Sequence, residues 1–309
     1  MLAALAATLL FSFSTICGHR SARMIGGTEA NFWRLCIAVL LLGVYSFTFG
    51  VGLSGPAFPW FLVSGIIGIG IGDVALFQAL PRLGPRLCSL LTNCLNPFAG
   101  ILIEWLWLGT TLSPLQFGCI GIIITGVSLA LSPKDHPRLN RKTLAAGLSF
   151  SVIAALGTAL GAVISRKAYA IANDLGPEID GANAAFQRIF GGMFVAGISV
   201  LVVKARHLKD PGILSLDTAL PVTRAKWRAV WYWVVLNSLA GQVFGISFMQ
   251  QALEQTPTGI VLAIISLSPI GVIPLAMIFE HERPTKRSLA GALLAVAGVI
   301  ALTLSKRHS

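Results

Sequence analysis

The sequence predicts an all-α integral membrane protein with ten transmembrane helices, arranged as two inverted five-helix repeats. Composition is the first reason: the 309 residues are 55% hydrophobic and 11% charged, whereas soluble proteins carry about 25% charged residues. The second is a series of ten apolar stretches, each about as long as the 20 residues with which a helix crosses a bilayer. The third is a proline-containing hydrophobic segment that occurs twice, at 78–97 and 250–269, as expected of a membrane protein built from two halves.

The expected spans follow the chain in order. The first repeat, residues 1–131, holds five of them: 2–18, 33–53, 57–80, 86–108 and 112–131. A polar segment, 132–143, leads to the second repeat, 144–305, which holds 144–170, 183–204, 229–252, 256–279 and 287–305 and is followed by a basic tail, 306–309. Lipid cannot satisfy backbone polar groups, so each span is expected to be a helix. The first span lacks a basic leading region and is interpreted as a retained helix rather than a signal peptide.

The two copies of the repeated segment align without a gap, from Gln78 against Gln250 to Pro97 against Pro269. The start of the second helix also matches the start of the seventh, which sets Arg34 against Arg188. An odd number of helices in each repeat inverts the second copy in the membrane. A binding site is therefore expected where the halves meet, near mid-membrane.

Polar residues near the paired prolines are the candidates for solute binding and translocation. Pro97 and Pro269 each remove a helix hydrogen bond, and broken helices are tolerated where they face protein or a water-filled cavity. The amides of Gln78 and Gln250 both donate and accept, which suits a zwitterion or a neutral polar solute; an interhelical hydrogen bond is the alternative. The residues that flank the prolines are further candidates: Asn93, Asn96, Ser266 and Ser268.

Four of the ionisable residues in or beside the predicted spans are singled out here. Asp73, inside the third helix, is a candidate for carrying a coupling proton, with a structural hydrogen bond or an arginine partner as alternatives. Arg34 and Arg188 are candidates for interfacial anchoring, for recognition of a carboxylate, or for an ion pair between helices. Glu104 is flanked by two tryptophans, a pattern typical of the membrane interface, so its carboxylate is expected to reach water there.

The net charge of +11 does not indicate nucleic acid, because the basic residues lie in short loops between spans. One set of loops holds 18 of the 23 Lys and Arg. The positive-inside rule places that set in the cytoplasm and both termini outside, with anionic lipids as possible contacts of the basic loops. The five cysteines lie in or at the ends of predicted spans without CxxC spacing, so they are interpreted as packing residues, and neither a metal nor a cofactor is expected.

Together these features resemble the EamA-type branch of the drug/metabolite transporter superfamily. The resemblance rests on the pattern repeated at 78–97 and 250–269, on Arg34 and Arg188, and on the Gly-rich segment 279–302. It implies that the first, third and fourth helices of each half border a central cavity that opens alternately to either side. It also implies that the solute is an amino acid, another small metabolite or a drug, usually exported, and that both termini are cytoplasmic. The last implication disagrees with the charge count, so orientation stays open.

The expected function is secondary-active transport of a small organic solute by alternating access, in the cell membrane. No ATP-binding P-loop occurs in the sequence, so the energy is expected to come from a solute or ion gradient. A non-transporting membrane scaffold and a membrane-embedded enzyme are the alternatives. The enzyme is disfavoured because neither an H-E-x-x-H nor a G-x-S-x-G motif is present. The sequence leaves the solute, its direction and the oligomeric state undetermined.

Overall fold

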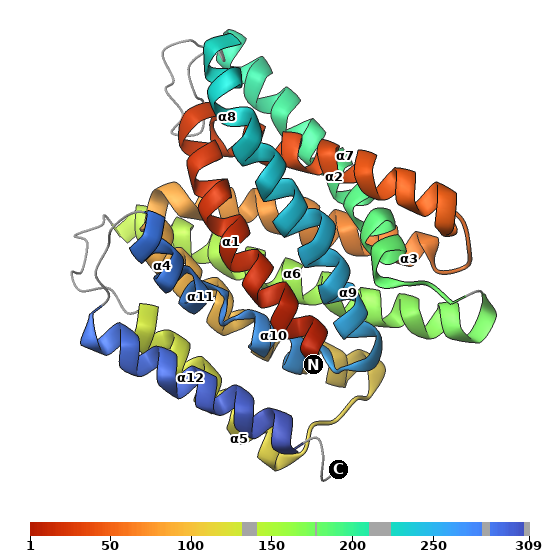
Figure 1. Ribbon diagram of the computed structural model, residues 1–309, viewed down its shortest axis with the longest axis vertical. Coiled ribbons are helices and arrows are strands. Elements are labelled where there is room, and N and C mark those ends of the chain that lie inside the picture. The colour runs from red at the N-terminus through yellow and green to blue at the C-terminus, as the bar shows by residue number, and fades with distance from the viewer. Residues whose placement is uncertain (132–140, 177, 210–223, 280–284, 306–309) are drawn as a thin grey trace.

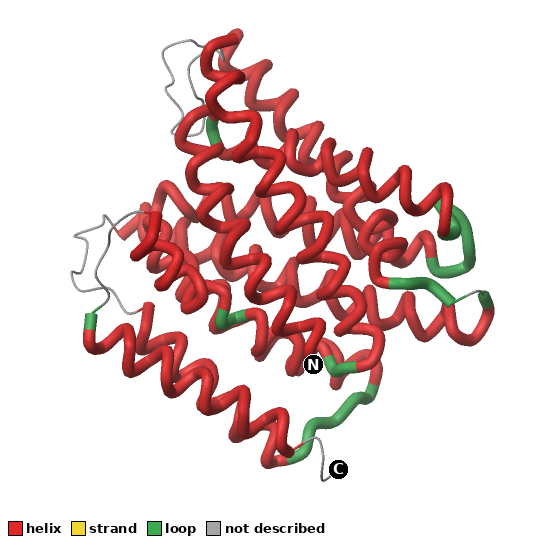
Figure 2. Tube along the Cα trace, in the orientation of Figure 1, coloured by secondary structure: helices red, strands yellow, loops and turns green. Residues whose placement is uncertain are grey.

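The computed structural model describes residues 1–131, 141–176, 178–209, 224–279 and 285–305. Over these residues every regular element is a helix (Figures 1 and 2), and ten stretches are long and apolar enough to cross a membrane. The predicted fold class is thereby confirmed. Most of the predicted linker 132–143 and the whole predicted tail 306–309 lie outside the described residues.

In chain order the helices are α1 (Leu2–Ile25), α2 (Gly27–Phe49), α3 (Phe58–Gly65), the π-helix η1 (Ile66–Ile71), α4 (Gly72–Leu108), α5 (Pro114–Leu131), α6 (Arg141–Leu175), α7 (Gly181–Lys209), α8 (Arg224–Asn237), the π-helix η2 (Ser238–Gly245), α9 (Ile246–Gln255), α10 (Thr258–Ile265), α11 (Ser268–Phe279) and α12 (Lys286–Ser305). The first helix extends well beyond the predicted residue 18, and only Gly26 separates it from α2. Gly26 has φ of 86°, a left-handed conformation that glycine adopts without steric cost.

The largest departure from the predicted boundaries is α4, which stays helical through the loop expected between residues 80 and 86. Contacts with α6 nevertheless show that the chain reverses there. Four positions along α4 meet α6 in turn: Gly72 beside Gly157, Leu83 beside Gly147, Cys88 beside Ser151 and Glu104 beside Arg166. The α6 partner first moves toward the start of that helix and then toward its end. The third and fourth crossings are therefore separate, as predicted, but a helical turn joins them.

The third and fourth crossings of each half pack against the first helix of the other half. In the first half, α3, η1 and α4 pack against α6, the first helix of the second half. In the second half, α8, η2, α10 and α11 pack against α1, the first helix of the first half (Figure 1). The second helices of the two halves, α2 and α7, also pack together. Residues from both halves therefore meet in the interior of the bundle.

The last helices of the two halves, α5 and α12, form a pair at the edge of the bundle (Figure 1). Gly126 and Gly291 allow this approach, since a Cβ on either glycine would collide with the backbone of the facing helix. Small residues at such crossings let helices pack closely in lipid. Ser288 on α12 is the one buried polar residue described on this pair, so nearly all of the buried polar groups described lie on the other helices.

Candidate functional site

Asp73, toward the end of the chain's third crossing, forms an ion pair with Arg34. Asp73 lies in the first turn of α4, directly after η1, and its Oδ2 is 3.0 Å from Nη2 of Arg34 on α2. Arg34 also donates from Nε to Oδ1 of Asn31 at 2.8 Å. The side chains of Arg34 and Asp73 are 18% and 21% exposed. The arginine partner that the sequence left as an alternative for Asp73 is therefore present.

Arg188, which aligns with Arg34, is buried inside the bundle on α7. The residue is 2% exposed, and its Nε and Nη1 have no hydrogen-bond partner among the described residues. An interfacial anchor keeps its charged group in water, which this burial does not allow. Recognition of an anion and an ion pair between helices are the two expectations that burial leaves for Arg188.

The two glutamines that the alignment makes equivalent lie toward opposite ends of the bundle. Gln78 accepts from Nη1 of Arg82 at 3.0 Å, and the guanidinium of Arg82 stacks 5.1 Å from the ring centre of Phe150 on α6. Gln250 lies one turn before Leu253, whose carbonyl accepts from Arg166 at the other end of α6. Phe150 and Arg166 are about 24 Å apart along α6, at 1.5 Å per residue. The structure therefore does not bring Gln78 and Gln250 together.

Gln250 differs from Gln78 in its surroundings. It is fully buried, and neither its Oε1 nor its Nε2 has a hydrogen-bond partner among the described residues. An amide in that position incurs the cost of desolvation without compensation. Gln250 consequently remains a candidate for solute binding, as expected from the sequence.

The second half contains the broken helix that Pro269 predicts. The chain turns at Ser266 and Leu267 between α10 and α11, and Ser268 donates to the carbonyl of Ile265 at 2.7 Å, the group that Pro269 leaves unpaired. Ser12 of α1 donates to the carbonyl of Ser268 at 2.9 Å. Side chains of both halves thus satisfy the backbone at the break, and Ser266 donates to the carbonyl of Ala263 at 2.7 Å.

In the first half α4 continues through Pro97 without a break. Asn93 donates from Nδ2 to the carbonyl of Ser89 at 2.9 Å. With its amide oriented as the surrounding carbonyls require, Asn96 donates to Thr92 and to Ala155 of α6, both at 3.1 Å. These two asparagines stabilise α4 and its packing on α6. The aligned prolines have different effects, because Pro97 lies inside a helix and Pro269 follows a break.

Sequence reasoning missed the ion pair that Glu104 forms with Arg166. Glu104 is 2% exposed, so the expectation that its carboxylate reaches water at the interface is wrong; its neighbours Trp105 and Trp107 are the exposed residues. Oε1 of Glu104 is 2.6 Å from Nε of Arg166 on α6. The signal available in the sequence was Arg166 itself, a charge near the end of a long apolar span.

The Glu104–Arg166 pair holds the turn between α9 and α10. Oε2 of Glu104 accepts from the backbone N–H of Thr258 at 2.6 Å, while Nη1 of Arg166 donates to the carbonyls of Leu253 at 2.9 Å and Thr256 at 2.5 Å. We call this set of residues the turn clamp. It joins α4, α6 and the fourth crossing of the second half at one end of the bundle.

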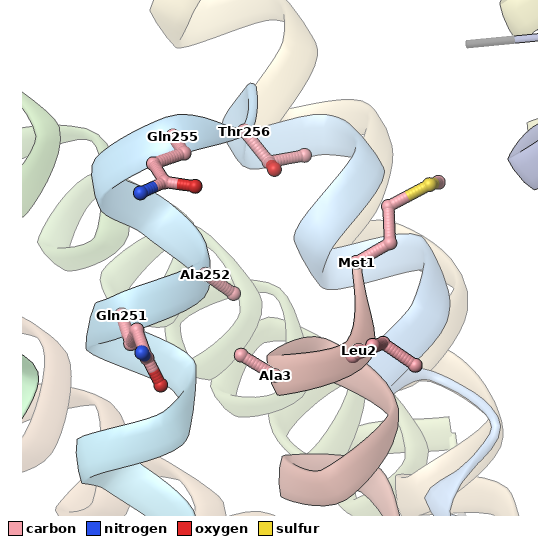
Figure 3. A pocket seen from close by; sticks show the side chains of 7 residues that line it. All are labelled: Met1, Leu2, Ala3, Gln251, Ala252, Gln255 and Thr256. Atoms are coloured by element: carbon pink, nitrogen blue, oxygen red, sulfur yellow. The ribbon is translucent and has the colours of Figure 1, made fainter. Parts of the chain in front are cut away.

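Two pockets open beside α9. The first, of about 330 Å³, lies between the start of α1 and the end of α9, where Ala3 and Ala252 face each other (Figure 3). The second, of about 370 Å³, lies between α2, the start of α7, and η2 with α9, and its polar lining residues are Tyr45, Asp180, Ser247 and Gln251. Neither pocket is lined by Arg188 or Gln250, so both groups are enclosed in this conformation.

Ten apolar crossings in two interlocked halves, with buried polar groups between them, define a multi-pass protein of the cell membrane. The sequence matches the EamA-like transporter family over residues 1–132 and 145–304, and the chain belongs to this family. It is a membrane transporter of a small solute rather than an enzyme.

Individual relatives are distant but match over nearly the whole chain. The Pseudopaline exporter CntI of Pseudomonas aeruginosa, from strains UCBPP-PA14 and PAO1, is 23% identical over 307 residues, which is 99% of this chain and 96% of the exporter. A crystal structure of another protein superposes with a TM-score of 0.78 at 17% identity, covering 99% of this chain and 97% of that chain. The last comparison supports the fold.

Proposed function

We propose that the chain is a secondary-active exporter of a small organic solute, working by alternating access between its two halves. The solute binds among the buried polar groups where the halves meet, and rocking of the halves exposes it to one side of the membrane and then to the other. The similarity to an exporter over 99% of the chain supports the direction. Gradients of the solute or of an ion supply the energy.

The main observation in support of this proposal is that the third and fourth crossings of each half pack against the first helix of the other half. Because η1 and α4 pack on α6, while α10 and α11 pack on α1, any movement of one half shifts the polar groups of the other. The break between α10 and α11 lies within this interface, and broken helices at repeat interfaces are typical of transporter binding sites. A rigid scaffold has no need of such a break.

Counterflow in liposomes tests the proposal. Purified protein is reconstituted in vesicles preloaded with a pool of amino acids, sugars, nucleosides and organic cations, and uptake of each labelled member is followed by mass. Exchange of one class, absent from protein-free vesicles, is the expected result. A folded protein that exchanges no member of the pool contradicts the proposal and returns the scaffold to consideration.

We further propose that Asp73 carries a coupling proton. Protonation would remove the negative charge that faces Arg34 at 3.0 Å, and α2 would then be free to move relative to α4. An imposed pH gradient is expected to drive net transport by the wild-type protein. The Asp73→Asn variant is expected to keep counterflow, which needs no net proton movement, but to lose the stimulation by the gradient. Wild-type transport that ignores the gradient removes this role.

A further inference from the structure

Arg188 is a buried charge for which the described residues offer no ion-pair partner. It is 2% exposed, Nε and Nη1 lack hydrogen-bond partners, and it forms no ion pair with any described carboxylate. A buried guanidinium without a counterion is strongly unfavourable. Its presence is explained if a ligand supplies the missing partner in part of the transport cycle.

Comparison of the two halves shows which partners are missing. Arg34, the equivalent of Arg188, is held by Asp73 at 3.0 Å and by Asn31 at 2.8 Å. In the alignment of the two halves, the position of Asp73 is occupied by Gly245 and that of Asn31 by Ala185. The arginine is thus repeated in the second half, and both side chains that satisfy it are absent.

The surroundings of Arg188 leave space for its guanidinium at a crossing of helices from both halves. Nη2 lies 2.7 Å from the position that a Cβ on Gly68 of η1 would take, and 3.1 Å from the corresponding position on Gly161 of α6. Any larger residue at Gly68 would displace the guanidinium. Single π-helical turns within α-helices are frequent at functional sites, so the placement of Arg188 against η1 supports a ligand-binding role.

The electrostatic balance around Arg188 favours an anion. Its charge interacts with Asp73 and with Tyr169; Asp73 is already paired with Arg34, which leaves one excess positive charge in the group. The hydroxyl of Tyr169 is buried and has no hydrogen-bond partner among the described residues. A second donor of hydrogen bonds is therefore available within the electrostatic range of the guanidinium.

We propose that Arg188 binds a carboxylate of the transported solute, which takes the place that the Asp73 carboxylate takes beside Arg34 in the first half. Two parallel N–H···O bonds from a guanidinium fit a carboxylate well. The substrate class is then small solutes that carry at least one carboxylate, and this inference rests on the proposed transport function. Arg188 is enclosed in this conformation, so the solute reaches it when the halves separate.

Counterflow with matched pairs of solutes tests the assignment. Vesicles containing wild-type protein are loaded with amino acids and keto acids, and the same compounds are offered as carboxamides, which lack the negative charge. The free acids are expected to exchange, and the carboxamides are expected to compete about 30-fold more weakly, the loss associated with removal of one member of a buried charge pair. This comparison needs no variant.

Variants of Arg188 supply the second readout. Arg188→Gln is expected to lose exchange of the free acids by about 30-fold, whereas Arg188→Lys, which keeps the charge without the planar fork, is expected to retain part of it. A stabilising shift in melting temperature on addition of the exchanged acid should occur for the wild type and be absent in Arg188→Gln. The lipid-facing variant Leu201→Ala, at a residue 68% exposed, controls for reconstitution.

The outcomes separate this inference from the proposed function. Exchange confined to solutes without a carboxylate, or free-acid exchange by Arg188→Gln at the wild-type rate, overturns the role of Arg188 and leaves the transporter intact. A folded wild-type protein that exchanges neither acids nor carboxamides nor any other member of the pool overturns the proposed function and this inference together.

Discussion

At the scale of single residues, burial distinguishes side chains that the sequence treats as equivalent. Neither amide atom of Gln250 has a hydrogen-bond partner in the part of the chain that the structure describes, whereas Gln78 accepts a hydrogen bond from Arg82. An unsatisfied buried polar group costs about 1–3 kcal/mol. We therefore expect Gln250→Met, which keeps the side-chain volume, to raise the melting temperature of the protein in detergent while it impairs counterflow.

The matched control for this prediction is Gln78→Met, which removes a hydrogen bond instead of an unpaired amide and should leave the melting temperature unchanged or lower it. Both glutamines are binding candidates on the alignment of the two halves, which treats them as equivalent. Part of their difference is local: Arg82 lies one turn after Gln78 and donates to it, whereas the residue one turn after Gln250 is Glu254. A lower melting temperature for Gln250→Met would assign that amide a structural role.

At the scale of elements, the number of crossings was predictable and the joints between them were not. Hydropathy and length identify ten spans because lipid allows only helices. Pro85 and Pro97 of the first half both lie inside α4. The prolines aligned with them in the second half, Pro257 and Pro269, lie at the starts of α10 and α11. The difference depends on side chains distant in sequence, such as Ser12 at the α10–α11 break and Arg166 at the α9–α10 turn.

Variants of the turn clamp measure how much a distant side chain stabilises the turn between α9 and α10. Glu104→Ala leaves Arg166 facing an empty position, and breaking a buried ion pair in this way costs about 3–5 kcal/mol. We expect a marked fall in melting temperature, because the turn between α9 and α10 loses the acceptor of the Thr258 N–H. The double variant Glu104→Leu with Arg166→Leu removes both charges and should recover much of the loss. Equal melting temperatures for wild type and Glu104→Ala would show that the pair does not hold the turn.

At the scale of the whole molecule, the unequal distribution of Lys and Arg between the two ends of the bundle predicts how the protein is oriented in the membrane. Met1 lies beside the end of α9 (Figure 3), and α12 runs antiparallel to α5, since Gly291 meets Ala130 and Gly298 meets Ile123. The start of α1 and the end of α12 therefore share the end of the bundle that carries the turn clamp. Most Lys and Arg lie toward the opposite end, which the positive-inside rule assigns to the cytoplasm.

Single cysteines in a cysteine-free background decide between this orientation and the one that the family resemblance implies. Ser54→Cys, in the exposed α2–α3 connection at the clamped end, is expected to react with a membrane-impermeant maleimide on intact cells. Thr143→Cys, exposed at the basic end, is expected to react only after permeabilisation. That result would place the turn clamp at the outer end of the bundle. The reverse labelling pattern would put the clamp at the cytoplasmic end, together with both termini, as the family resemblance implies.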